Sequence, residues 1–440
     1  ELSSTSNDYG GSTTVSAGTL KLGTADVIPN GSAVSVSSGA TLNMNGKAET
    51  IGSLAGAGAV TLSGVIANVS GQAGALTKTG AGTLTLSGAN TFTGKTTVSA
   101  GTLSIAADSN LGTAPGTVAT DQLSINGGTL AITTGFTMST NRGITIGNSD
   151  GTIDVSNAQT LTYGGVIAGA SSSADFTKAG LGTLTLSGSS SYTGATTISA
   201  GTLQFSSSSA GALSSSTAVT VSSGATFAVN GRTTSVGSIA GAGTITLGAG
   251  TLTAGGDNSS TTYTGAISGT GGLTKAGSGM LTLEQDLTFT GALTISAGGT
   301  VRLGTGGATG SVASTSIVNN GTLNINRSVL YSYSGVISGA GGVTISGSGG
   351  LSLTGNNTFT GAVTVDAGSN LTIDRSSCDS DADRTIRFGN IVNNATITFN
   401  LVPIVGAPDN GSLTCTYPSV MSGTGEIVKT GTGTLVLTGS

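Results

Sequence analysis

Three carboxylates at alternate positions form the segment of the sequence that most resembles a metal-binding motif. Asp379, Asp381 and Asp383 stand in the segment CDSDADR. Carboxylates in such a segment can converge on a hard cation such as calcium. An EF-hand loop needs glycine at position six and glutamate at position twelve, where this segment has Arg384 and Asn390. An EF-hand is therefore excluded, which leaves an irregular calcium site or a solvated acidic loop paired with arginine.

Both cysteines of the chain lie in the same stretch. Cys378 and Cys415 are the ends of a segment that breaks the otherwise uniform composition and also contains prolines and charged residues. Two such cysteines are expected to be oxidised in an oxidising compartment, which is where the export implied by the family resemblance described below would place the chain. We therefore expect a Cys378–Cys415 disulfide that closes a loop excursion at residues 372–418. Two buried and inert thiols are the alternative.

Acidic and basic side chains also raise the possibility of polysaccharide cleavage. That chemistry needs paired acids, or acids with arginine or lysine, on one face. Glu284 and Asp286 stand nearly alone. The dense candidates are Asp374, Asp379, Asp381, Asp383, Arg375, Arg384 and Arg387. Because these all fall in one expected loop, we predict no catalytic residues, and no cofactor besides the calcium considered above.

Composition excludes several classes of function. The 440 residues contain no histidine, which removes histidine acid–base catalysis, histidine-ligated metals and Ser–His or Cys–His nucleophile pairs. The 14 basic residues are scattered among 19 acidic ones, and aromatic residues are only 4%, so a nucleic-acid partner is not expected. Leu, Val, Ile and Thr are abundant and the net charge is only −5, so the chain is expected to fold.

Internal repeats account for the 76 glycines and the many serines and threonines. The segment LTKTGAGTLTLSGANTFTGKTTVSAGTL begins at Leu76 and returns at Phe176, Leu273 and Val343. A second half of this unit begins at Tyr9, and a first half begins at residue 427. Such self-similarity over the whole chain predicts one continuous array over residues 1–440.

Two residue types recur at fixed places in these repeats. The repeated lysines, which precede TG or AG, are Lys78, Lys178, Lys275 and Lys429. We predict that they are solvated turn residues in a sparse row on one edge. The repeated tyrosines, which precede a GVISG-type turn, are Tyr163, Tyr263, Tyr333 and Tyr417. We predict that they pack locally in the core or at its rim.

Strands rather than helices fit the pattern of the repeat. In TLTLSG the apolar Leu84 and Leu86 alternate with Thr83 and Thr85, and glycine-containing pairs end each run. A string of antiparallel sandwiches would need aromatic cores and linkers, which the sequence lacks. A parallel β-helix needs only a narrow column of small aliphatic side chains. We therefore predict an all-β parallel β-helix, a single elongated rod of about 20 coils.

The repeated segment resembles the passenger-associated repeat of bacterial autotransporters, the type V secreted proteins of Gram-negative bacteria. The resemblance implies a right-handed parallel β-helix that is exported through a signal peptide and a C-terminal barrel and displayed or released outside the cell. The chain shows neither signal peptide nor barrel, so we expect the passenger or part of it. A membrane would be involved only through the absent barrel.

Three functions remain open on this basis. The first is a structural adhesin, a surface rod that binds a cell-surface or matrix receptor or another copy of itself through its strand faces and loops. The second is a polymerising subunit of an envelope or extracellular filament, because the terminal half-repeats could stack head to tail. The third is a polysaccharide-acting β-helix enzyme; we expect no enzyme activity.

Overall fold

The computed structural model describes residues 1–37, 39–45, 47, 53–56, 59–62, 65–66, 73–207, 213–379, 385–402 and 413–439. In this part of the chain the only helical segments are a 3-10 turn, η1 (Asp108–Leu111), and one short helix, α1 (Ser376–Asp379). The remaining elements are strands that pair in parallel. The predicted all-β parallel β-helix is thereby confirmed, with about 18 turns against the 20 expected.

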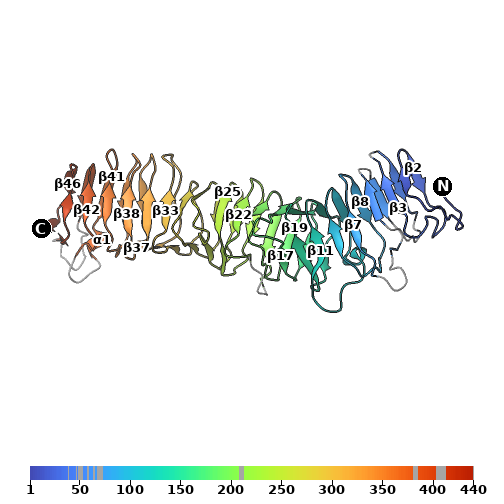
Figure 1. Ribbon diagram of the computed structural model, residues 1–440. Helices are drawn as coiled ribbons and strands as arrows, with labels where there is room; N and C mark the ends of the chain where they lie inside the picture. The colour runs from blue at the N-terminus through green and yellow to red at the C-terminus, as the bar shows by residue number, and fades with distance from the viewer. Residues whose placement is uncertain are drawn as a thin grey trace. The chain divides into compact units, whose positions relative to one another are not determined.

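The chain divides into two compact units, Glu1–Ala228 and Val229–Ser440, and each is described by itself. The single continuous rod over residues 1–440 stays a prediction. Figure 1 labels the strands along the chain.

Unit 1 contains three parallel stacks of strands. The first stack is β1 (Thr13–Val15), β3 (Ala33–Val36), β5 (Ser53–Gly56), β7 (Leu76–Lys78), β9 (Thr96–Val98), β11 (Ala119–Ile125), β14 (Arg142–Ile146) and β17 (Ile167–Gly169). The second is β2 (Thr19–Lys21), β4 (Thr41–Asn43), β6 (Ala59–Leu62), β8 (Thr83–Leu86), β10 (Thr102–Ile105), β12 (Thr129–Ile132), β15 (Gly151–Val155), β18 (Phe176–Ala179), β20 (Thr196–Ile198) and β22 (Ala218–Val221). The third is β13 (Phe136–Met138), β16 (Thr160–Tyr163), β19 (Thr183–Leu186), β21 (Thr202–Phe205) and β23 (Thr226–Ala228).

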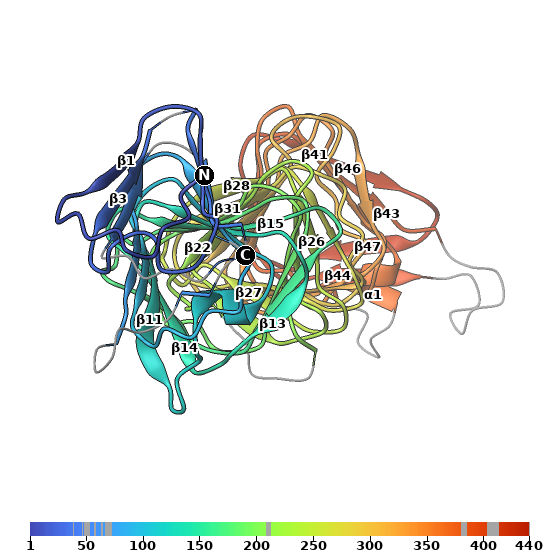
Figure 2. The ribbon, with the colours of Figure 1, turned by 90° about the vertical axis from the view of Figure 1, so that its right-hand side faces the viewer.

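Unit 2 is built in the same way. One stack is β24 (Thr234–Val236), β27 (Leu252–Ala254), β30 (Leu273–Lys275), β32 (Leu293–Ile295), β34 (Ser316–Asn319) and β37 (Val336–Ser338). The next is β25 (Ser238–Gly241), β28 (Thr261–Tyr263), β31 (Met280–Leu283), β33 (Thr300–Leu303), β35 (Thr322–Ile325), β38 (Gly342–Ile345), β40 (Val363–Val365), β42 (Ile391–Asn393) and β45 (Met421–Ser422). Further stacks are β26 (Thr244–Thr246) with β29 (Ala266–Ser268); β36 (Tyr331–Tyr333), β39 (Leu351–Leu353), β41 (Asn370–Asp374), β43 (Thr396–Asn400) and β46 (Glu426–Thr430); and β44 (Thr414–Tyr417) with β47 (Thr434–Leu437). Figure 2 shows β43 beside β46.

The two halves of each repeat are consecutive coils that pair with each other. In the first full copy Leu76 is opposite Thr96, and the later copies keep the same spacing of partners. Equivalent positions of successive coils therefore stack on one another. For example, Leu84 of β8 lies against Leu103 of β10. Strands with the burial pattern of β8, where Leu84 and Leu86 are buried and the threonines between them are partly exposed, form the aliphatic column. The alternation in the sequence thus decides which side chains are inside.

In each full copy of the repeat, the third side of the first coil carries an aromatic residue instead of a strand. These residues are the buried Phe92, Tyr192, Phe289 and Phe359. Two positions before Phe92 and Phe359, a buried asparagine completes the backbone hydrogen bonds of the preceding coil. Asn90 Oδ1 accepts from Ile66 N at 2.8 Å, and Asn357 Oδ1 accepts from Ile337 N at 2.9 Å. Asparagine therefore replaces the missing strand partner on this side.

The second full copy has serine at this position. Ser190 is buried, and its hydroxyl has no hydrogen-bond partner. Ser190→Asn is expected to stabilise the chain by about 1 kcal/mol, because the longer side chain reaches the backbone N–H of Ile167 as Asn90 reaches that of Ile66. Urea unfolding of the two proteins measures the difference, and Ser190→Ala, which removes the unpaired hydroxyl without adding an acceptor, is the control. An asparagine variant no more stable than the alanine variant would contradict the expectation.

Candidate functional site

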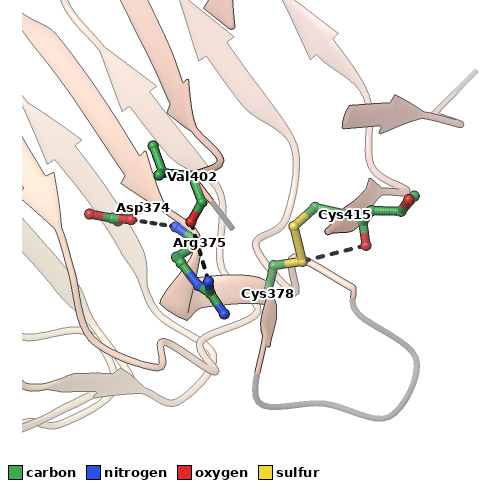
Figure 3. The surroundings of a disulfide bond; sticks show 6 residues. Asp374, Arg375, Cys378, Val402 and Cys415 are labelled. Carbon is green, nitrogen blue, oxygen red and sulfur yellow. Dashed lines mark hydrogen bonds between the residues drawn. A yellow bond between two sulfur atoms is a disulfide. The ribbon is translucent and has the colours of Figure 1, made fainter. Parts of the chain in front are cut away.

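The expected disulfide is present near the C-terminal end, whereas the described part of residues 372–418 contains the stacked strands β42, β43 and β44, so a loop excursion over the whole range stays a prediction. Cys378 in α1 and Cys415 on β44 are bonded, with their Cα atoms 5.8 Å apart (Figure 3). Both residues are buried, at 1% and 0% exposure. The bond therefore links α1, which follows β41, to β44, while β42 and β43 between them remain paired in the stacks.

Two of the candidate charged residues, at the end of β41, have structural contacts. Asp374 ends β41, and its Oδ1 accepts from the backbone N of Arg375 at 2.7 Å. The buried Arg375 donates from Nη1 to the carbonyl of Val402 at 3.2 Å (Figure 3). The first contact is local, and the second joins the segment after β41 to the segment after β43.

The candidate calcium ligands are not tested by the structure. Asp379 is the last residue of α1, whereas Asp381, Asp383 and Arg384 lie outside the described residues. Within the described ranges, no group of three or more Cys, Asp or Glu residues could hold a metal ion. Arg387 is exposed and has an interaction partner. The calcium site stays a prediction.

Asp286, the other acidic candidate, holds a turn of the solenoid. Its Oδ1 accepts from the backbone N of Ser311 at 3.0 Å and from the hydroxyl of the same residue at 2.7 Å. The guanidinium of Arg327 lies 3.7 Å away. These contacts cap a turn.

The prediction of solvated repeat lysines is wrong for three of the four. The exposed fractions of Lys78, Lys178 and Lys275 are 4%, 0% and 2%. Each side chain points inward from the end of its strand and turns back to the carbonyl oxygens of the glycine-containing turn. Only Lys429 is exposed, and β46, which carries it, has no further strand on its other side in the described chain.

The ammonium group of each buried lysine is enclosed by backbone carbonyls. Lys178 Nζ donates to Ala179 O at 2.7 Å, to Gly180 O at 2.9 Å and to Ala200 O, one coil further on, at 3.3 Å. Lys78 repeats this arrangement with Thr79, Gly80 and Ala100. An ammonium has three donors and no acceptor, so three carbonyls satisfy it completely. The lysine therefore links one turn to the turn of the next coil.

Burial changes the protonation of these lysines. Desolvation lowers the pKa of Lys178 to about 8, an effect that the nearby carboxylate of Asp154 partly offsets. Desolvation also lowers the pKa of Lys78, and that of Lys275 against the opposing influence of Asp257. The fourth copy has Ile345 at the same place, fully buried, so the position also accepts an apolar side chain.

This protonation predicts an unusual dependence of stability on pH. Between about pH 8 and 10 the unfolded chain keeps a proton on Lys178 that the folded chain releases, so the free energy of unfolding rises with pH. Below pH 8 both states are protonated and the cost of the buried charge is fully present. Lys178→Met is expected to remove a rise on the order of 2 kcal/mol. Urea midpoints between pH 7.5 and about 10 measure it.

A matched control for this experiment is Lys429→Met. Lys429 donates to Thr430 O and Gly431 O, like the buried lysines, but is exposed. Its replacement should leave the pH profile unchanged. The range stops near pH 10 because burial raises the pKa of tyrosines such as Tyr417, to about 12, so that stability falls at higher pH. Parallel profiles for Lys178→Met and wild type would disprove the assignment.

The repeated tyrosines pack in the core, as predicted. All four are buried, with exposed fractions of 4% or less. Tyr163 donates its hydroxyl proton to Arg142 O at 2.6 Å, Tyr263 to Gly243 O at 2.8 Å and Tyr417 to Gly389 O at 2.6 Å. The hydroxyl of Tyr333 has no partner. Each tyrosine thus fills the column and, in three copies, binds a backbone carbonyl.

Hydroxyl-bearing residues form ladders on the outer faces. In unit 1, Thr77 is level with Thr97, and in unit 2 Thr274 is level with Thr294. These side chains alternate with buried ones along their strands and are partly or fully exposed. Large apolar side chains such as Leu181 and Val118 are exposed singly. The outer surface is therefore suited to many small contacts.

Stacked parallel coils with a repeated two-coil unit define a β-solenoid. The model of the passenger-associated-transport-repeat matches residues 1–22, 76–105, 176–205, 273–303, 343–369 and 427–440. The chain thus carries these repeats and, as the sequence predicted, resembles the passenger of a Gram-negative autotransporter.

One curated relative has a named role. The chain is similar to the "Adhesin BmaC autotransporter" of Brucella suis biovar 1 (strain 1330), with 36% identity over 282 residues. The match covers 59% of this chain and 8% of that relative. No solved structure matches the chain. No helix among the described residues has the length and apolar character needed to cross a membrane.

Proposed function

We propose that this chain is part of an adhesive passenger, displayed outside a Gram-negative cell, that attaches to a cell-surface or matrix receptor or to another copy of itself. The observation that carries this proposal is the similarity to an autotransporter adhesin through the repeats that build the solenoid. The role is non-enzymatic, since the repeats use their charged residues to hold turns together.

The outer hydroxyl ladders support contact through the strand faces. Thr253, Thr274 and Thr294 stand at equivalent places on three successive strands. A matching row on a second surface can form many weak hydrogen bonds and van der Waals contacts with them. Homotypic association of this kind needs no binding pocket, which fits a solenoid whose interior is filled by its own side chains.

Attachment of coated beads tests the proposal. Beads carrying the 440-residue chain should bind to host cells, to extracellular matrix or to one another more than beads coated with albumin. Free chain should compete with the coated beads. Equal attachment of the two kinds of bead to all three targets would refute an adhesive role.

A double charge substitution tests whether the ladder makes the contact. Thr274→Lys with Thr294→Lys places like charges on neighbouring strands of the outer face and should reduce bead clustering several-fold. Thr77→Lys with Thr97→Lys is the matched change in unit 1. Loss of clustering in the first pair alone would assign self-association to the unit 2 face, and unchanged clustering in both would exclude the ladders.

A further inference from the structure

Asparagine followed by glycine is the sequence most prone to spontaneous loss of side-chain ammonia. The glycine nitrogen attacks the asparagine carboxamide, and the missing Cβ leaves the approach open. The pairs that lie wholly in the described part of the chain are Asn30–Gly31, Asn126–Gly127, Asn230–Gly231 and Asn320–Gly321. The structure distinguishes among these four.

The nucleophilic N–H is hydrogen-bonded in three of the pairs. Gly127 N donates to Asp150 O at 2.7 Å, and Gly231 N donates to Leu247 O at 2.9 Å. Gly321 N donates to the side-chain oxygen of Asn319 at 3.2 Å. A bonded N–H must first be released before it can lose its proton and react.

Asn30 and Gly31 form the unprotected pair. No described residue accepts a hydrogen bond from Gly31 N or forms a hydrogen bond with the Asn30 carboxamide. Both residues are exposed, and the position where a Gly31 Cβ would stand has no atom within 4 Å. The turn is closed by Ser32 N donating to Pro29 O at 2.9 Å, so the pair lies at an open tip.

We propose that Asn30 is a self-modification site that converts to isoaspartate and aspartate through a cyclic imide. Deprotonated Gly31 N bonds to Cγ of Asn30; the Cγ–Nδ2 bond breaks, and the nitrogen leaves as ammonia with a proton from water. Water then adds to one ring carbonyl. Opening at the main-chain carbonyl gives isoaspartate, and opening at Cγ gives aspartate. One water is gained and one ammonia is lost, with no change in oxidation state.

The product changes the first coil of unit 1. Either acid adds one negative charge, taking the formal net charge from −5 to −6. Isoaspartate also adds a methylene to the backbone of the turn that Pro29 and Ser32 close. Ser32 Oγ donates to Gly11 O at 2.9 Å, so a longer turn loosens the contact with the segment before β1. This inference is independent of the adhesive role.

Peptide mapping by mass spectrometry tests the site. The purified full chain is held at mildly alkaline pH and body temperature, and fragmentation locates each gain of about 1 Da. Asn30 should convert roughly tenfold faster than Asn126, Asn230 or Asn320, because only its neighbouring N–H is free. Asn30→Gln removes the site, since a glutamine would have to form a larger ring.

The same measurement in concentrated urea separates structure from local sequence. There the four pairs should convert at similar rates. Two outcomes would overturn the proposal: native Asn30 converting no faster than the other three, or its advantage persisting undiminished in urea. The first would show that the turn is protected, and the second that the fold does not select the site.

Discussion

Alanine in place of Gly201 is expected to lower the free energy of unfolding by roughly 4 kcal/mol. Gly201 has a φ of 60°, which disfavours any residue with a Cβ. Its Cβ would also stand 2.3 Å from Gly182 O and 2.5 Å from Gly180 O. The clash involves backbone atoms, which cannot move aside alone. Because Gly180 O accepts from Lys178, the same change also disturbs the lysine enclosure.

Gly298→Ala is the matched control for this loss. Gly298 also has a left-handed conformation, with a φ of 80°, but no atom lies within 4 Å of its Cβ position. Alanine there should cost only about 1 kcal/mol, the conformational part of the penalty. Urea unfolding of both variants gives the comparison. Equal losses would show that close stacking of the turns contributes nothing.

Breaking the Cys378–Cys415 bond is expected to destabilise the C-terminal coils by about 3 kcal/mol. The bond closes a segment with a sequence separation of 37, and its loss frees that segment in the unfolded state. Amide exchange in β43 and β44 should then be roughly a hundredfold faster, while unit 1 should be unaffected. Hydrogen exchange with and without a reductant measures both.

Alanine at both positions gives a control for the chemistry of the reductant. Cys378 and Cys415 are buried, so serine would add unpaired hydroxyls, whereas Cys378→Ala with Cys415→Ala removes the link without adding a polar group. The reductant should have no effect on this variant. Unchanged exchange in β44 after reduction of wild type would contradict the expected role of the bond.

Much of the fold could be predicted from the sequence because the same alternation of apolar and polar residues, ended by a glycine-containing turn, recurs in every copy of the repeat. Alternating Leu84 and Leu86 give strands, and the spacing of the copies gives the order in which the coils stack. The tyrosine positions could also be predicted, since a large aromatic such as Tyr263 cannot remain exposed at a recurring place without cost.

The lysines show where the sequence misleads. Charge next to glycine is typical of a solvated turn, and nothing in KTG or KAG reveals three carbonyls placed to receive the ammonium of Lys178. A signal did exist. Lys78 stands two residues after the buried Leu76, so its side chain is on the same, inward face of the strand. In the fourth copy Ile345, an apolar residue, occupies the equivalent position.

The sequence alone also did not predict that buried asparagines accept backbone hydrogen bonds from the preceding coil. Asn90 and Asn357 stand in NTF segments without a strand signal, and their role depends on the backbone of the coil before them. Recurrence of NTF ahead of the second half-repeat could have indicated it. The two-unit division and the contacts of Arg375 depend on tertiary packing, which no short motif encodes.

The pairing of coils has a consequence for how the chain acquires its structure. Leu76 pairs with Thr96 and Phe176 with Thr196, so ladder partners in the described strands are separated by about one coil of sequence. Closing such short loops costs little entropy, and each finished coil offers a template for the next. Folding can therefore proceed coil by coil, with a nearly constant entropy cost for each added coil. A longer array need not nucleate more slowly than a short one.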